Sequence, residues 1–194
     1  SHVSFSYHGA QNAVTDIDFS LEKGQTHGII GATGSGKSTI INLLLRFYDP
    51  DSGTISVDGK NVKEVTRRSL RLNYGMVLQD TYLFSETVRE NIRYGRPDAS
   101  DQQVEEAAKL ANADSFIRHL PYGYDTVLQD NASNLSQGQR QLLAIARAIL
   151  ADPSILILDE ATSSIDTRTE LKIQDALLIL MKGRTSFIIA HRLS

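Results

Sequence analysis

Residues 31–39 read Gly-Ala-Thr-Gly-Ser-Gly-Lys-Ser-Thr and fit the pattern G-x-x-x-x-G-K-[ST] without a mismatch. The glycines of this stretch are Gly31, Gly34 and Gly36. They let the backbone curl so that successive N–H groups point at anionic oxygens. Lys37 at this spacing can reach the β- and γ-phosphates of a nucleotide, and the Ser38 hydroxyl can ligate Mg²⁺. A plain Gly/Ser-rich turn gives no reason for Lys and Ser at this offset, so the stretch predicts a phosphate-binding loop.

An acidic pair follows a continuous apolar run. Residues 155–158 read Ile-Leu-Ile-Leu and are followed by Asp159 and Glu160. An Asp at the end of such a strand can hold Mg²⁺ through water, and a neighbouring Glu can polarise a water for in-line attack on a phosphate. An acidic pair is also typical of a helix N-terminus, where it interacts with the helix dipole. In a chain that also carries the phosphate loop, we interpret the pair as part of a phosphoryl-transfer site.

A third pattern lies at residues 135–139, which read Leu-Ser-Gln-Gly-Gln. Ser136 and Gln139 fit a capping box at the start of an apolar helix. The plain interpretation is a helix start. The functional one is that the Ser136 hydroxyl and the Gly138 backbone face an anion. Because Ser136 lies far along the chain from Lys37, that anion can also belong to a partner subunit.

The elements that position these residues are predicted from the spacing of apolar side chains. Period-two alternation indicates half-buried strands at residues 3–7 and 17–21, and glycine turns bracket a short strand at 53–59. Further strands are expected at 26–30, 74–78, 155–158 and 186–190. Apolar spacing predicts a helix after the phosphate loop, and capping boxes predict further helices that start at Ser100, Ser136 and Thr167.

The alternation of strands and helices predicts an α/β fold with a mostly parallel sheet that helices cover on both faces. Ligands of such sheets bind at the carboxyl ends of the strands. Four of the candidate residues follow directly after expected strands and therefore share that edge. They are Gly31, Gln79, Asp159 and His191.

We expect a single domain over residues 1–194. Residues 1–86 and 151–194 would form the α/β core with an N-terminal antiparallel β subdomain, and residues 87–150 an inserted all-helical subdomain that carries Ser136. Strand-like alternation is already under way at Val3, and the chain stops shortly after an apolar run. We therefore expect a piece of a longer protein that is truncated at both ends.

Composition narrows the function classes. The net charge of −3 argues against binding to nucleic acid through a positive field. The chain has no cysteine, which excludes disulfides and thiolate metal sites within it. No apolar run approaches the ~20 residues that cross a bilayer, and no basic leader with an apolar stretch opens the sequence.

Together these residues resemble the nucleotide-binding domain of the ATP-binding cassette (ABC) family, over nearly the whole chain. The resemblance implies that the chain binds ATP and Mg²⁺. It implies nucleotide contacts from Tyr7, which would stack on adenine, and from Gly31, Thr33, Gly34, Ser35, Gly36, Lys37, Ser38, Thr39, Ser136, Gly138, Gln139 and Asp166. The implied metal ligands are Ser38, Gln79 and Asp159. The implied catalytic residues are Glu160, His191, Lys37 and Gln79, with His191 on the γ-phosphate.

Residues 3–7, 83–92 and 190–194 resemble exporters whose membrane domain is fused upstream. In such proteins ATP hydrolysis at the cytoplasmic face of a membrane powers transport, and two cassettes pair head to tail. The sequence departs from the family pattern at two places. Gln137 stands where the 135–139 pattern commonly has glycine, and residues 129–132 stand where exporters usually have a Gly-Glu-Arg-Gly-like run. Both suit one half of a heterodimeric exporter, and a homodimer stays open.

Three alternatives come from other classes. A soluble cassette protein could act on DNA or ribosomes, although the acidic net charge opposes nucleic acid. A regulatory module could hold ATP without cleaving it, which Glu160 and His191 oppose. A small-molecule kinase could use the phosphate loop, but it would need the 135–139 pattern only as a helix cap.

Overall fold

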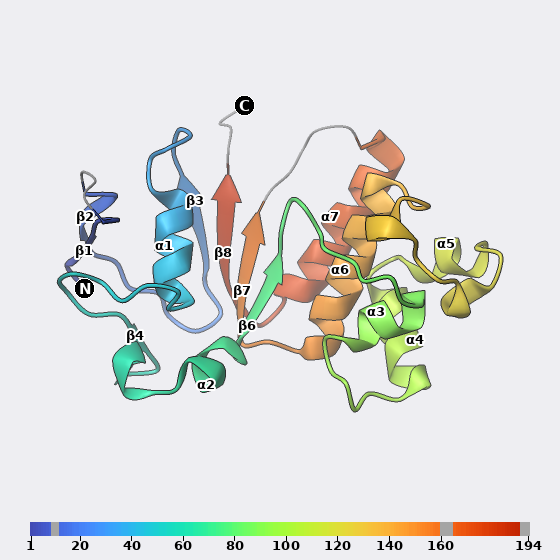
Figure 1. Cartoon of the computed structure of the whole chain (residues 1–194), viewed down its shortest axis with the longest axis horizontal. Helices are drawn as coiled ribbons and strands as arrows, with labels where there is room; N and C mark the ends of the chain where they lie inside the picture. The colour runs from blue at the N-terminus through green and yellow to red at the C-terminus, as the bar shows by residue number, and fades with distance from the viewer. Residues whose placement is uncertain (9–11, 160–164, 191–194) are drawn as a thin grey trace.

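The computed structural model describes residues 1–8, 12–159 and 165–190. At its centre lies a four-stranded, fully parallel sheet with the strand order β3-β8-β7-β6. The strands are β3 (Thr26–Ile30), β6 (Tyr74–Val77), β7 (Ile155–Asp159) and β8 (Thr185–Ala190). Their carboxyl ends lie together at the upper edge of the sheet in Figure 1. The predicted parallel sheet is confirmed.

The apolar sequence of β7 reflects its central position. Leu156, Ile157 and Leu158 point alternately to the two sheet faces, and each is at most 3% exposed. A strand buried on both faces must be apolar at every position, since neither side chain row meets water. This burial holds Asp159 at the end of a rigid strand.

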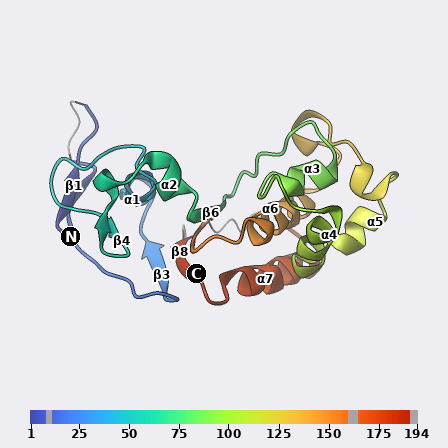
Figure 2. The ribbon, with the colours of Figure 1, turned by 90° about the horizontal axis from the view of Figure 1, so that it is seen from below.

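Helices cover both faces of the sheet. Helix α1 (Lys37–Leu44) packs through Ile41 on one face, against Ile157 and Phe187. Helices α6 (Gln137–Ala151) and α7 (Thr167–Met181) cover the other face. Seen from below in Figure 2, the sheet lies between α1 and this helix pair. The two cores therefore share one sheet.

The N-terminal part adds small antiparallel pieces beyond α1. These are β1 (Val3–Phe5) with β2 (Val14–Ile17), β4 (Ser56–Val57) with β5 (Lys60–Asn61), the 3-10 turn η1 (Val62–Glu64) and α2 (Arg67–Arg71). The prediction of a strand at 17–21 was wrong beyond Ile17. The Phe19 ring stacks on His27 of β3 at a centroid distance of 5.2 Å, so this stretch passes toward the central sheet instead of pairing with β1.

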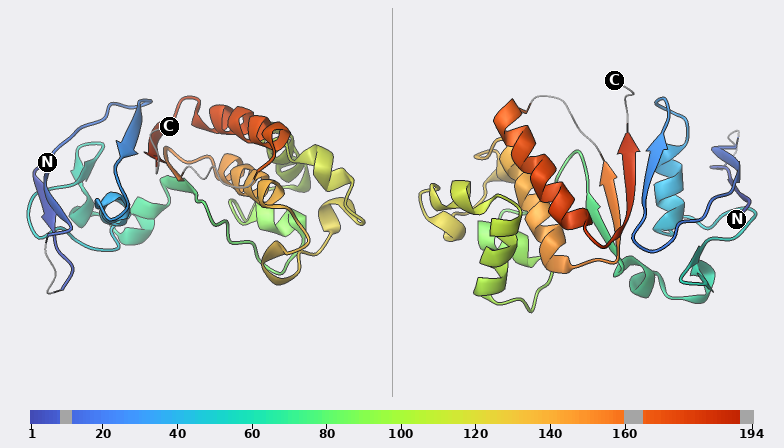
Figure 3. Two further views of the ribbon diagram at one scale, coloured as in Figure 1. Left: turned by 90° about the horizontal axis from the view of Figure 1, so that it is seen from above. Right: turned by 180° about the vertical axis from the view of Figure 1, so that it is seen from behind.

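A group of short helices packs on α6 at the other end of the molecule (Figure 3). It comprises α3 (Val88–Arg93), α4 (Asp101–Leu110), α5 (Asp114–Arg118) and the 3-10 turns η2 (Gly123–Asp125) and η3 (Asp130–Ala132). The capping box predicted at Ser100 is confirmed. The one predicted at Thr167 was wrong: Asp166 is the N-cap of α7, because its carboxylate reaches the Thr169 N–H.

Within the described ranges, no helix combines the length and the apolar character that a membrane span requires.

Candidate functional site

The phosphate loop owes its shape to glycines in left-handed conformations. Gly34 has a φ of 82° and Gly36 a φ of 92°, a region that side-chain-bearing residues rarely adopt. A Cβ on Gly36 would lie 2.7 Å from the Ala13 carbonyl oxygen, so this glycine is also required by close packing. The loop thus turns sharply between the end of β3 and the start of α1.

The backbone N–H groups in the first turn of α1 receive no capping hydrogen bond from a side chain. Gly36 is its N-cap and offers no side-chain hydrogen bond, and no acidic residue lies in the turn. The first N–H groups of a helix have no partner within the helix, and together with the helix dipole they favour an anion. Ser38 is exposed in this turn, as are Thr33, Gly34 and Ser35 in the loop. The residues present therefore fit a phosphate group.

Lys37 holds its charge inside the loop. Its Nζ donates to the carbonyl oxygens of Gly31 at 2.5 Å and Ala32 at 2.8 Å, while the residue is only 7% exposed. The packed aliphatic stem keeps the ammonium group at the loop rather than in solvent. A positive charge and a set of backbone N–H groups thus meet in one place.

Tyr7 lies beside the same helix turn. Its hydroxyl is 3.3 Å from Thr39 Oγ1, and its ring packs edge-on against Phe5 and Tyr48 at centroid distances of 4.9 and 5.2 Å. This aromatic cluster fixes the Tyr7 ring next to the phosphate loop. The role of Tyr7 in adenine stacking stays a prediction.

Asp159 and Gln79 lie at the edge of the sheet where the loop begins. Asp159 is in register with Ile189, which is in register with Ile29, so these three residues share the sheet face that α1 covers. Two strand spacings, about 10 Å, separate β7 from β3. Gln79 is exposed, two positions beyond the end of β6. Carboxylate, amide and hydroxyl oxygens suit Mg²⁺.

The capping box predicted at the start of α6 is confirmed. Ser136 Oγ accepts from the Gln139 N–H at 3.2 Å, and Gln139 Oε1 accepts from the Ser136 N–H at 3.0 Å. A hydroxyl has one proton and two lone pairs, so Ser136 can cap the helix and still donate its proton to an anion. Capping and phosphate contact are therefore compatible.

The starts of α6 and α7 are in contact. A Cβ on Gly138 would lie 2.4 Å from Thr169 Cγ2, so a larger residue at this position would force the Thr169 side chain to shift. Asp166 caps α7 through the Thr169 N–H at 3.0 Å. Hydrogen bonding from the Thr169 side chain and then from its backbone N–H lowers the pKa of the Asp166 carboxyl group. Gly138 thus has a packing reason in addition to the predicted contact with an anion.

The structure brings Lys37, Ser38, Gln79 and Asp159 to one edge of the sheet, but it does not bring Ser136 to the phosphate loop. Helices α1 and α6 both begin toward the upper edge in Figure 1, yet α1, which follows the loop, covers one face of the sheet and α6, which Ser136 caps, covers the other. Glu160 and His191 lie outside the described residues.

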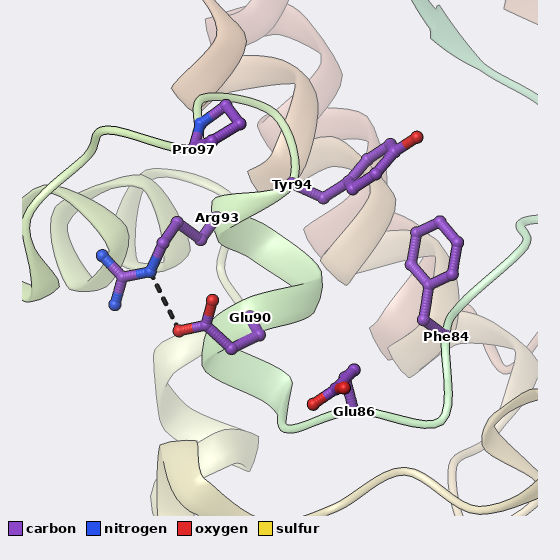
Figure 4. A pocket seen from close by; sticks show the side chains of 6 residues that line it. All are labelled: Phe84, Glu86, Glu90, Arg93, Tyr94 and Pro97. Atoms are coloured by element: carbon purple, nitrogen blue, oxygen red, sulfur yellow. Dashed lines mark hydrogen bonds and ion pairs between the residues drawn. The ribbon is translucent and has the colours of Figure 1, made fainter.

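A pocket of about 410 Å³ lies beside α3 (Figure 4). Its walls are Phe84, Glu86, Glu90, Arg93, Tyr94 and Pro97. The sequence analysis used residues 83–92 only for their resemblance to exporters and did not predict this pocket. It also missed Arg147, whose signal was available: Arg147 is the only charged residue in the apolar stretch 141–150.

A glycine loop between strand and helix, at the carboxyl end of a parallel sheet, defines the chain as a P-loop nucleotide-binding domain. A family model described as ABC transporter matches residues 14–163. The chain therefore belongs to the ABC transporter family, whose general activity is ATP hydrolysis coupled to transport.

Individual proteins agree with this assignment. The uncharacterized ABC transporter ATP-binding protein YfiC of Bacillus subtilis is 61% identical over 99% of this chain and 32% of its own length. The fatty acid ABC transporter ATP-binding/permease protein of Mycobacterium tuberculosis is 52% identical over 100% of this chain and 31% of its own length. A solved structure of a bacterial Atm1-family ABC exporter with ATP bound matches with a TM-score of 0.89 and 43% identity, over 98% of this chain and 33% of that one. The chain thus spans about a third of the length of the curated relatives it matches.

Proposed function

We propose that this chain is the ATPase domain of an exporter and that it hydrolyses ATP at a site shared by two such domains. The observation that carries the proposal is the position of Ser136 relative to Lys37. Lys37 begins α1 and Ser136 caps α6, and these two helices start toward the same edge of the sheet but cover its opposite faces. A second domain placed head to tail would bring its Ser136 to this chain's loop, which a single chain cannot do.

The roles of the residues follow from their chemistry. The loop N–H groups and Lys37 would bind and neutralise the β- and γ-phosphates. Glu160 follows the rigid end of β7 and would take a proton from the attacking water. His191 would contact the γ-phosphate and orient Glu160. Tyr7 would stack on adenine.

Mg²⁺ is the cofactor that we propose for this site. Ser38, Gln79 and Asp159 would hold it, and when bound it supplies positive charge to the β- and γ-phosphate oxygens. The remaining contacts to the nucleotide are proposed from Thr33, Ser35 and Thr39 of the same chain and from Ser136, Gly138, Gln139 and Asp166 of the second domain.

The partners of the domain are part of the proposal. The name of the mycobacterial relative joins an ATP-binding and a permease part in one protein, and the matched solved structure is that of an exporter. Both support a membrane domain in the same protein, with this domain at the cytoplasmic face of the membrane. The second ATPase domain would be an identical or a related copy.

The test uses the full-length protein that contains this chain, with any cysteine outside it replaced by serine. In a Glu160→Gln background, Ser35→Cys and Ser136→Cys are introduced together, and oxidation is followed on a denaturing gel. We expect a product of doubled mass with ATP and Mg²⁺, and little of it with ADP. Cross-links within one chain, or cross-linking that does not depend on nucleotide, would refute the two-domain site.

Hydrolysis is tested separately by phosphate release from the same protein without the cysteines. We expect the unmodified protein to release phosphate from ATP and the Glu160→Gln variant to be slower by about 10²–10⁴-fold. Turnover of the variant at the unmodified rate would remove Glu160 from its proposed role.

A further inference from the structure

Arg147 is a partly buried cation whose partners are not acids. It lies in α6 between Ala146 and Ala148, both at most 5% exposed. Among the ion pairs of the described residues, none includes Arg147. Burial lowers the pKa of its guanidinium group. A charge that is removed from water without a carboxylate needs other compensating partners.

Those partners are backbone and amide oxygens of the segment that follows Gln79. Nη1 donates to the Tyr82 carbonyl oxygen at 3.0 Å, and Nε donates to the Asn91 carbonyl oxygen at 2.9 Å. Nη2 donates to Asn91 Oδ1 at 3.3 Å. Three nitrogens of one planar group thus reach two points of the chain, a geometry that lysine cannot reproduce.

Two neighbouring aromatic rings lie against the same guanidinium group. Its central carbon lies 5.6 Å from the Phe84 ring centroid and 5.5 Å from that of Tyr94, within the range of cation–π contacts. The two rings lie 4.7 Å apart and face the pocket in Figure 4. The hydrogen bonds and the rings therefore hold one side chain from several directions.

Asn91 extends this attachment toward the start of α3. It is 1% exposed, and its Oδ1 also accepts from the Phe84 N–H at 2.8 Å. Its Nδ2 donates to the Phe84 and Thr87 carbonyl oxygens, both at 3.0 Å. A Cβ on Gly95 would lie 2.2 Å from the Arg147 carbonyl oxygen, so α3 ends directly on the α6 backbone. Residues 82–95 are thus fastened to α6 around one arginine.

We propose that Arg147 is a positioning residue that makes the segment after Gln79 and the helix that starts at Ser136 move as one body. Gln79 stands three residues before Tyr82, and Ser136 caps the helix that carries Arg147. A change at Gln79, on one nucleotide, is thereby transmitted to Ser136, on the other. The coupling between the two nucleotides deepens the proposed function and rests on it. The attachment of residues 82–95 to α6 does not depend on the proposed function.

The experiment measures whether the two elements keep a fixed distance. Spin labels are attached to Ser85→Cys and Ala151→Cys, two exposed sites on the fastened segment and on α6, in the full-length protein with other cysteines replaced. We expect one narrow distance distribution that is the same with and without ATP and Mg²⁺. In Arg147→Lys the distribution should broaden and become dependent on nucleotide. The kcat of hydrolysis should fall about tenfold with the KM for ATP unchanged.

Arg184→Lys is the matched control. Arg184 also donates to the backbone oxygens of Pro153 at 2.9 Å and Leu180 at 2.7 Å, and to Asp152 Oδ1 at the end of α6 at 2.5 Å. Its printed hydrogen bonds do not reach residues 82–95. It should leave the distribution narrow and kcat and KM unchanged. Equal effects of both substitutions would mean general loosening and would overturn the proposal.

A second variant covers the case in which Arg147→Lys does not fold. Tyr94→Leu removes one ring and leaves the three hydrogen bonds, so it should broaden the distribution by a smaller amount. A narrow distribution in Arg147→Lys, or in Tyr94→Leu if only that variant folds, would refute the proposal. If the unmodified protein does not hydrolyse ATP, the proposed function fails, while the distances without nucleotide still test the fastening.

Discussion

The starts of α1 and α6 lie toward the same edge of the sheet, but they treat their backbone N–H groups in opposite ways. Helix α6 satisfies two of them locally through the Ser136 and Gln139 side chains. Helix α1 begins at Gly36, with no side-chain cap and no acid in its first turn. A helix start that caps itself is stable without a ligand, whereas one that leaves its donors open is built to receive an anion. The comparison indicates that the N-terminus of α1 binds the phosphates of this chain's own nucleotide. The N-terminus of α6 would instead contact a nucleotide bound by a second domain.

The largest effect is expected from removing the positive charge of Lys37 at the start of α1. We expect Lys37→Ala to lower kcat/KM for ATP by at least about 100-fold, because the loop then lacks the cation that meets the phosphates. Steady-state phosphate release and nucleotide binding by calorimetry measure the effect. Lys63→Ala, an exposed lysine in η1, is the control and should behave as the unmodified protein. Equal losses in both variants would argue against a specific role.

Two glycine substitutions in the phosphate loop separate the cost of a positive φ from the cost of a steric clash. Gly36→Ala adds a Cβ at 2.7 Å from the Ala13 carbonyl oxygen, and Gly34→Ala adds one with no atom within 4 Å, although both residues have a positive φ. We expect Gly34→Ala to cost about 1 kcal/mol of unfolding free energy and Gly36→Ala about 3 kcal/mol, since only the latter also clashes. Denaturant titration measures both. Similar costs would show that the backbone at residue 13 yields easily.

Substitutions at Ser136 distinguish the cap of α6 from its contact with an anion. Ser136→Ala removes the cap and should lower the unfolding free energy by about 1 kcal/mol. Ser136→Asp keeps a capping oxygen but places a negative charge at the helix start. We therefore expect near-normal stability with strongly reduced ATP hydrolysis. Full hydrolysis by Ser136→Asp would contradict the idea that this helix start meets a phosphate.

The smallest expected effect concerns the cap of α7 and its dependence on pH. The hydrogen bond from Thr169 lowers the pKa of Asp166 from its ordinary value of 3.8. The cap therefore stabilises the folded state above that value and loses its contribution as the pH falls through the folded-state pKa. Asn also caps helices but does not titrate in this range.

Asp166→Asn should thus differ from the unmodified protein in the slope of stability against pH below 3.8. Denaturant midpoints measured across the acid range provide the measurement. Parallel curves for the two proteins would show that Asp166 has the same pKa in the folded and unfolded states.

The sequence predicted the local features of this comparison well. The glycine spacing of residues 31–36 and the Ser-x-x-Gln pattern at Ser136 depend on neighbouring residues only, and both led to the right local structure. The prediction of a capping box at Thr167 was wrong, and the reason is also local. Asp166, one residue earlier, is an equally good N-cap and reaches the Thr169 N–H.

What the sequence could not provide are contacts between distant residues. Gly138 fits a signature pattern, but its close approach to Thr169 appears only when α6 and α7 are packed together. Arg147 binds the Tyr82 carbonyl oxygen across 65 positions. Periodicity identifies a lone arginine in an apolar helix, yet it does not say which backbone oxygens surround it.

Strand β3 is an edge strand: within the part of the chain that the structure describes, its neighbour in the sheet is β8. The strand contains neither a charged residue nor proline, and Ile30 at its end is 56% exposed. Edges of this kind attract further strands from other molecules. These 194 residues, prepared alone at high concentration, are therefore expected to aggregate edge to edge, and dilute solutions or a protective fusion at this edge will keep them monodisperse.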